Sequence, residues 1–214
     1  MTVMPIRSLS VSRSLEIKNR KLDLLWVALS MVLAVFTWRY AIPDAYTPIW
    51  MFVALHIQCG LIFAIRQPAR LSTIRPLEVL VTVLSLTYFV AFEVKPSSSA
   101  ALALSGGVVT AIGSLFTFIS IQWLGRSFAV LPSLRDIRTS GMYRFVRHPI
   151  YLSYIVAGLG TLMRHPSLYN TSVVLAGFVL MMWRIRFEER LLAQDELYRN
   201  YMDAVRYRLI PGLY

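Results

Sequence analysis

Long apolar runs constrain the fold of this chain more than any other feature of its sequence. A helix needs roughly 20 apolar residues to cross the hydrocarbon core of a bilayer, and backbone polar groups in that core must bond within the protein. Such runs recur along the chain between short polar breaks. The sequence therefore predicts an all-α integral membrane protein with about six transmembrane helices. The predicted spans cover residues 22–38, 48–65, 76–94, 100–124, 150–163 and 169–187.

The composition agrees with this class of protein. Hydrophobic residues make up 57% of the chain and charged residues only 15%, whereas a soluble domain carries about 25% charged residues. No apolar core precedes the first run, so we expect that run to be a span and not a removed signal sequence. The single cysteine, Cys59, lies inside an apolar run and is expected to be a buried thiol, with no disulfide and no metal site.

The net charge of +11 comes from basic residues at the ends of apolar runs, and not from a basic domain of the kind that binds nucleic acid. With six spans, all but three of the 22 basic residues fall on one side of the membrane; the exceptions are Arg39, Lys95 and Arg164. Lys and Arg concentrate on the cytoplasmic side of membrane proteins. We therefore expect both termini to be cytoplasmic.

The last two spans are separated only by the turn at residues 164–168, which predicts a helical hairpin. The fourth span carries Gly106, Gly107 and Gly113, and small residues at this density let helices approach closely. The alternative is that they line a path for a lipid tail. Residues 125–149 are basic and rich in turn formers, so we expect an irregular cover there.

Two charged motifs stand at the ends of apolar runs. Arg147 and His148 precede Pro149, which suits the first turn of the fifth helix because proline needs no N–H there. The free N–H groups of that turn predict an anion site. On the sixth run Arg184 and Glu188 share a helix face, and Glu189 points about 100° away.

These motifs leave more than one interpretation open. The basic motif alone could anchor lipid headgroups, and Arg184 with Glu188 could be a surface ion pair worth about 0.3–0.5 kcal/mol. Together, an anion site and carboxylates suit a zwitterionic ligand that carries a nucleoside, such as S-adenosylmethionine, although not that ligand alone.

The motif region, residues 125–214, resembles the isoprenylcysteine carboxyl methyltransferase family and the related phospholipid methyltransferases. We therefore divide the chain into the first four spans, residues 1–124, and this region with its hairpin and C-terminal cytoplasmic segment. The resemblance is carried by Ser140 to Tyr143, Arg147 to Tyr151, Arg184, Glu188, Glu189, Tyr198, Tyr201 and Arg208 to Gly212.

The resemblance implies a membrane enzyme whose S-adenosylmethionine lies in a cytoplasmic pocket closed by the C-terminal segment. A lipophilic acceptor, a prenylcysteine-like carboxylate or a lipid headgroup, would enter from the bilayer. Arg184 would face the acceptor, with Tyr201 and Arg208 as further substrate contacts, and no metal is implied. The implied cofactor contacts are Arg135, Asp136, Ile137, Arg138, Tyr143, His148, Pro149, Ile150, Tyr151 and Glu188. Residues 135–138 depart from the His-x-Leu-Val often found in the family, which predicts contacts through the backbone.

The implied reaction is direct displacement at a methyl group. A carboxylate acceptor needs alignment and exclusion of water but no general base, and Arg184 would orient it by charge-assisted hydrogen bonds. An amine acceptor must lose a proton to a base, for which Glu189 is the nearest candidate.

Two other functions remain open on the sequence. Membrane sterol reductases, which bind NADPH, have a similar Arg-His-Pro-x-Tyr element and a similar C-terminus. The adjacent Glu188 and Glu189 favour the methyltransferase, because a phosphorylated dinucleotide gains little from two carboxylates. The third possibility is a non-catalytic membrane lipid-binding protein.

The distribution of basic residues generates a topology prediction. Reporter domains fused after Arg75 and after Tyr214 should report the cytoplasm, and a reporter fused after Pro96 should report the opposite side. A cytoplasmic signal from the fusion after Pro96 would overturn the six-span arrangement.

Overall fold

A computed structural model describes residues 24–25, 27–28, 31–32, 35, 49–73, 75–94, 97 and 99–214 of the chain. The predicted first span and the basic residues before it lie largely outside the described residues. Elsewhere the predicted spans correspond to helices, and the fourth begins and ends at the predicted residues. The α-helices are α2 (Ile49–Ile65), α3 (Pro76–Thr87), α4 (Ala100–Leu124), α5 (Pro149–Arg164), α6 (Leu168–Leu192) and α7 (Glu196–Ala204).

Shorter elements connect these helices. The third predicted span is α-helical only to Thr87 and continues as the 3₁₀ helix η1 (Tyr88–Ala91). The expected irregular cover contains η2 (Gly125–Ser127), the two-residue strand β2 (Ser133–Leu134) and η3 (Gly141–Arg144). Strand β1 (Leu71–Ser72) pairs antiparallel with β2 and fastens the α2–α3 connection to this cover.

Two described helical segments, Ala100–Ser127 and Leu168–Leu192, are long and apolar enough to cross a membrane. Val53–Ile65 and Pro76–Thr87 are shorter apolar helical segments. These helices support the predicted integral membrane protein, whereas the number of spans and the side of each terminus stay predictions.

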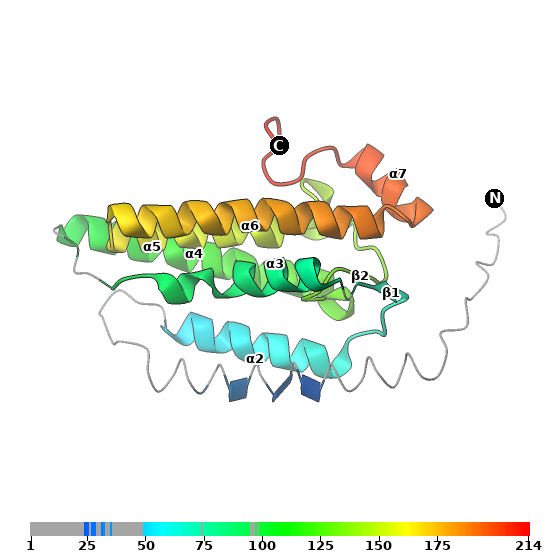
Figure 1. The fold of residues 1–214 in the computed structure, drawn as a ribbon, viewed down its shortest axis with the longest axis horizontal. Coiled ribbons are helices and arrows are strands. Elements are labelled where there is room, and N and C mark those ends of the chain that lie inside the picture. Colours follow the sequence, from blue (N-terminus) through cyan, green and yellow to red (C-terminus); the bar gives the residue numbers. More distant parts are fainter. Residues whose placement is uncertain are drawn as a thin grey trace.

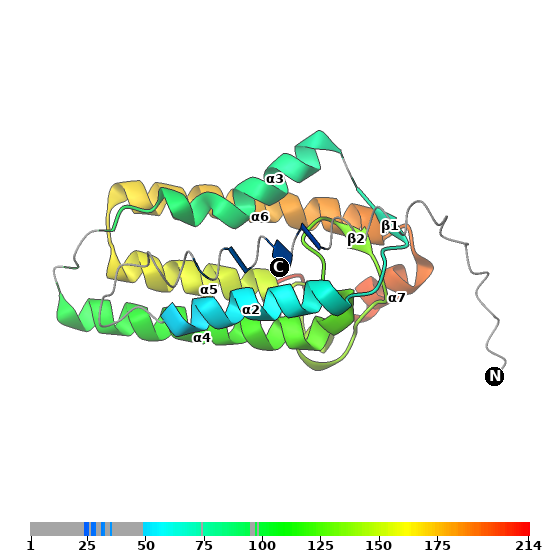
Figure 2. The same cartoon turned by 90° about the horizontal axis from the view of Figure 1, so that it is seen from below.

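Figure 1 shows α3, α4, α5 and α6 running side by side along the long axis of the bundle. Helix α4 packs along α5, α3 along α6, and α2 against α4. The α5–α6 turn lies at one end, and β1, β2 and α7 lie at the other (Figure 2). We call the latter the α7 end.

The glycines of α4 serve helix packing. A Cβ added at Gly113 would lie 2.5 Å from the backbone nitrogen of Ala157, and one added at Gly160 would lie 2.4 Å from that of Thr110. No side chain fits at either place, so the two backbones touch. Across the same contact Thr117 and Ser153 share a buried hydrogen bond of 2.7 Å. Of the two interpretations of these glycines, the structure supports close packing.

Candidate functional site

A pocket opens at the α7 end of the bundle, between the irregular cover, α5, α6 and α7. It brings together most of the residues that the sequence predicted for cofactor and substrate. Of the predicted residues, its wall contains Arg135, Asp136, Ile137, Arg138, Tyr143, His148, Ile150, Tyr151, Arg184, Glu188 and Tyr201. Pro149 is fully buried, and neither Glu189 nor Arg208 belongs to this wall.

Several residues of the pocket wall were not predicted from the sequence. Tyr154 follows Tyr151 by three positions and Leu192 follows Glu188 by four, so helical spacing could have identified both. Leu86 and Phe128 come from α3 and from the loop after η2. Nothing in their own sequence context marks them, because only the tertiary packing brings those segments to the pocket.

Glu188 and Arg184 lie one turn apart on the pocket face of α6. The Tyr151 hydroxyl donates to Glu188 Oε2 at 2.5 Å, and no described residue bonds Glu188 Oε1. The Arg184 guanidinium lies 5.1 Å from the centre of the Tyr151 ring. Arg184 is only 5% exposed. The possibility of a surface ion pair between Arg184 and Glu188 is therefore wrong.

Other hydrogen bonds fix the position of Arg184. Its Nη2 donates to the Val130 carbonyl at 2.6 Å, and its Nη1 lies 3.5 Å from the Ser85 hydroxyl. Its Nε is buried and has no hydrogen-bond partner among the described residues. A buried hydrogen-bond donor without a partner lowers the stability of the protein. A ligand atom that accepts a hydrogen bond from Arg184 Nε would therefore bind favourably.

Tyrosines line the opposite part of the pocket. Asp195 caps α7 by accepting from the Leu197 N–H at 2.8 Å, and α7 then turns Tyr198 and Tyr201 inward. The Tyr201 hydroxyl donates to the Tyr143 carbonyl at 2.6 Å. Burial, followed by the charge of Glu188, raises the pKa of Tyr143 well above its usual value, so its phenol stays neutral.

Glu189 occupies a separate, buried position behind the pocket wall. Its Oε1 accepts from Arg147 Nε at 2.7 Å and lies 3.2 Å from His148 Nε2, and its Oε2 accepts from Arg208 Nε at 2.7 Å. Burial alone would lower the pKa of Arg208, but the hydrogen bond and the charge of Glu189 outweigh burial and raise it. The predicted base therefore has both oxygens engaged by cationic groups or a ring nitrogen, an arrangement that suits positioning better than proton transfer.

The same cluster anchors the C-terminal segment, residues 205–214. Arg147 Nη1 donates to the carbonyls of Val205 and Arg206 at 2.6 and 2.8 Å. The backbone N–H groups of Arg147 and His148 donate to the carbonyls of Tyr207 and Arg208 at 3.0 and 2.9 Å. These two amides precede the first turn of α5, whose N–H groups were predicted to form an anion site. That anion site stays a prediction, and the C-terminal segment lies beside it.

Among the described residues, no group of three or more His, Cys, Asp or Glu side chains could hold a metal ion. The polar groups that line the pocket include the carboxylates of Asp136 and Glu188, several guanidinium groups and several tyrosines.

Comparisons with known proteins indicate which class of protein this chain resembles. Residues 100–200 match the family described as phospholipid methyltransferase. A solved structure of a eukaryotic intramembrane Ras methyltransferase, an isoprenylcysteine carboxyl methyltransferase, is similar at 21% sequence identity. The similarity covers 89% of this chain and 75% of that one, with a TM-score of 0.49. The comparison with curated proteins found no match.

The family match and the apolar helices support a membrane methyltransferase. More particularly, residues 100–200 include all of α4, α5 and α6, and the pocket residues Tyr151, Arg184 and Glu188 lie on α5 and α6. The resemblance predicted from the sequence is thereby confirmed.

The Glu189 cluster generates a prediction about the C-terminal segment. Glu189→Gln removes the charge that compensates Arg147 and Arg208, and breaking a buried ion pair costs about 3–5 kcal/mol. We expect a lower thermal midpoint in detergent and faster hydrogen exchange in residues 205–214. Glu196→Gln, an exposed change on α7, is the control. Unchanged exchange in the Glu189 variant would show that the cluster does not hold the segment.

Proposed function

We propose that this chain is an S-adenosylmethionine-dependent methyltransferase that acts on a lipophilic acceptor carrying a carboxylate. One observation carries the proposal: Glu188 and Arg184, of opposite charge, lie a turn apart on α6 and line the same pocket, with the Tyr151 ring beside both. A cationic cofactor and an anionic acceptor can therefore bind side by side in this pocket.

The residues of the pocket fit this cofactor. Glu188 Oε1 is available to an ammonium group or a ribose hydroxyl, and such a charge-assisted bond is strong. Arg135 and Arg138 line the pocket and would bind the cofactor's carboxylate, and Tyr143 and Tyr198 would offer aromatic faces to an adenine ring. When bound, S-adenosylmethionine supplies an electrophilic methyl group.

The chain's own residues would then align the acceptor and exclude water. Arg184 is fixed by Val130 and Ser85, so its unpartnered Nε would present a defined donor to the acceptor carboxylate. The C-terminal segment, held by Glu189 and Arg147, covers the start of α5 beside the pocket. Alignment of this kind contributes substantially to rate when the reaction needs no proton transfer.

The same geometry favours a carboxylate over an amine as acceptor. An amine must lose a proton to a base, and Glu189, the base suggested by the sequence, has both carboxylate oxygens engaged. Arg184 at the inner part of the pocket would repel an ammonium group and attract a carboxylate. Methyl transfer to a phospholipid amine, but not to alkyl carboxylates, would overturn this choice.

Glu188→Ala tests the cofactor half of the proposal. Loss of a hydrogen bond to a charged group costs about 1.5–3 kcal/mol, so the affinity for S-adenosylmethionine should fall about tenfold or more by titration calorimetry. NADPH, titrated in parallel, should show no binding to the unaltered protein. The exposed Glu196→Ala is the matched control. Equal affinity in a folded Glu188→Ala variant would remove Glu188 from the cofactor site.

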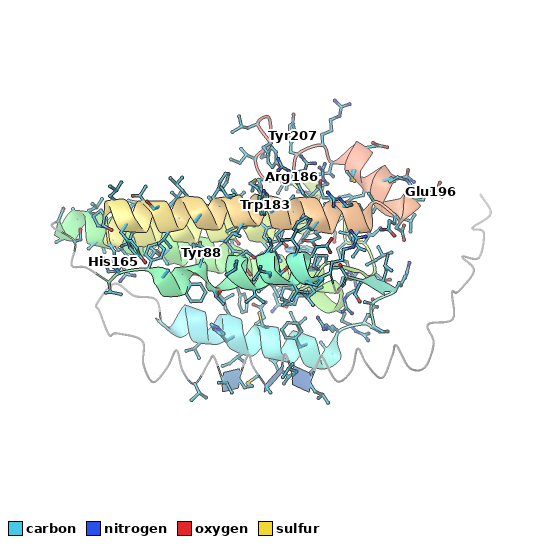
Figure 3. The ribbon with its side chains drawn as sticks, viewed as in Figure 1. Tyr88, His165, Trp183, Arg186, Glu196 and Tyr207 are labelled. Atoms are coloured by element: carbon cyan, nitrogen blue, oxygen red, sulfur yellow. The ribbon has the colours of Figure 1, made fainter. Side chains whose placement is uncertain are left out.

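Arg184→Ala tests the acceptor half. Turnover with an alkyl carboxylate should largely disappear, while S-adenosylmethionine affinity changes by less than about threefold, because the guanidinium is proposed to contact the acceptor only. Arg184→Lys should restore little, since lysine lacks the planar fork. Arg186→Ala, exposed two residues further along α6, should keep turnover (Figure 3). Loss of cofactor binding in Arg184→Ala would assign the arginine to the cofactor instead.

A further inference from the structure

The residues that line the inner end of the pocket lie on one face of each of two helices. The lining residues of α5 and of the turn before it are at positions 147, 148, 150, 151 and 154, and those of α6 are at 192, 188 and 184. Residues three or four apart share a helix face. The next positions on these faces, moving away from the α7 end, are Gly158 on α5 and Met181 and Gly177 on α6.

Tyr88, from η1, fills the space that these two glycines leave. A Cβ added at Gly177 would lie 2.6 Å from the Tyr88 ring, and one added at Gly158 would lie 3.1 Å from its hydroxyl. The ring therefore spans from α6 toward α5. It lies roughly 6 Å along α5 beyond Tyr154, the innermost lining residue of that helix.

The surroundings of Tyr88 connect it to the pocket. It packs against the buried cluster of Tyr151, Met181, Ile185 and Leu209. Tyr151 is itself part of the pocket wall, as is Leu86, two residues before Tyr88. Figure 3 shows Tyr88 between the α5–α6 turn, at His165, and the α7 end, at Glu196. A ligand chain that passed Arg184 toward the centre of the bundle would meet this ring.

We propose that Tyr88 is the floor of the acceptor site and limits how long an apolar chain can extend between α5 and α6. The inference rests on the proposed function, in which Arg184 holds the acceptor carboxylate at the mouth of this space. Protein interiors are packed without large voids, and the two glycines open a space only as wide as the ring that occupies it. Replacing the ring by a methyl group would therefore extend the space available to the chain.

The size of the effect can be estimated from apolar burial. Each buried methylene of an acceptor raises affinity by roughly fourfold, up to the length at which the chain reaches the floor. The apolar area of one aromatic ring corresponds to about four or five methylenes. Tyr88→Ala should therefore move the length limit by about that number, whereas Tyr88→Phe, which keeps the ring, should leave it unchanged.

The experiment uses the purified full chain in detergent and a series of S-alkyl thioether carboxylates that grow by one methylene. Binding is measured by titration calorimetry, and methyl transfer from labelled S-adenosylmethionine is measured in parallel. Each compound partitions into micelles to the same extent with every variant. A difference between variants in how affinity depends on alkyl chain length is therefore due to the protein. Phe89→Ala is the matched control, because this neighbouring aromatic residue of η1 is 59% exposed.

The expected result is a limit about four or five methylenes longer in Tyr88→Ala, with the original limit in Tyr88→Phe and Phe89→Ala. If Tyr88→Ala does not fold, Tyr88→Leu should give a smaller shift in the same direction. An unchanged limit in a folded variant would overturn the proposal. If Tyr88→Ala shifts the length limit for binding but no variant transfers a methyl group, Tyr88 limits the chain length and the proposed function is wrong. If the protein transfers methyl groups but Tyr88→Ala does not shift the length limit, the proposed function holds and the role of Tyr88 is wrong.

Discussion

The ion-pair cluster around Glu189 is the interaction on which the site depends. It joins three segments far apart in sequence: the start of α5 at Arg147 and His148, the end of α6 at Glu189, and the C-terminal segment at Arg208. Burying such a cluster is not itself a large source of stability, because desolvation offsets the attraction between the charges. Its effect is to fix positions, because Arg147 and Arg208 each bond one oxygen of the buried Glu189 carboxylate and few other positions of the three segments would keep both bonds. The start of α5, with Tyr151 and its pocket wall, is thereby held against α6.

Helix α6 separates two kinds of chemistry by its own geometry. Successive residues of a helix point about 100° apart, so Glu189 faces the C-terminal segment while Glu188 faces the pocket. One turn before Glu188, Arg184 faces the same pocket, and two turns further back Gly177 admits the Tyr88 ring. One helix therefore sets the distances between Glu189, which holds the C-terminal segment, and the pocket residues Glu188 and Arg184. The same helix positions Tyr88 through Gly177.

The close contact between α4 and α5 keeps the opposite wall in place. With Gly113 against Ala157 and Gly160 against Thr110, the two backbones are too close for either helix to shift without a clash. Tyr151 and Tyr154, which lie on α5 and line the pocket, therefore have a fixed position relative to α4. Gly141, with φ of +61°, packs directly on the Trp123 ring and ties the cover to the end of α4 in the same way.

The sequence by itself determined the class of protein and about half of the residues that line the pocket. Apolar runs predicted helices α2 to α6, because a segment buried in lipid must bond its backbone internally, and α4 has the predicted bounds. Helix α7 lies beyond the predicted spans. Helical spacing placed Arg184 and Glu188 on one face, and the motif resemblance selected Tyr143, His148 and Tyr151. The roles of these residues remain proposals.

Only the tertiary structure decided where long-range partners meet. The sequence could not separate Glu188 from Glu189 by role, because the difference lies in Arg147, His148 and Arg208, which belong to other segments. It could not show that the amides of Arg147 and His148 bond the C-terminal segment. Nor could it place Tyr88 between Gly158 and Gly177, because periodicity reports which face a residue occupies on its own helix and not which distant residue packs against that face.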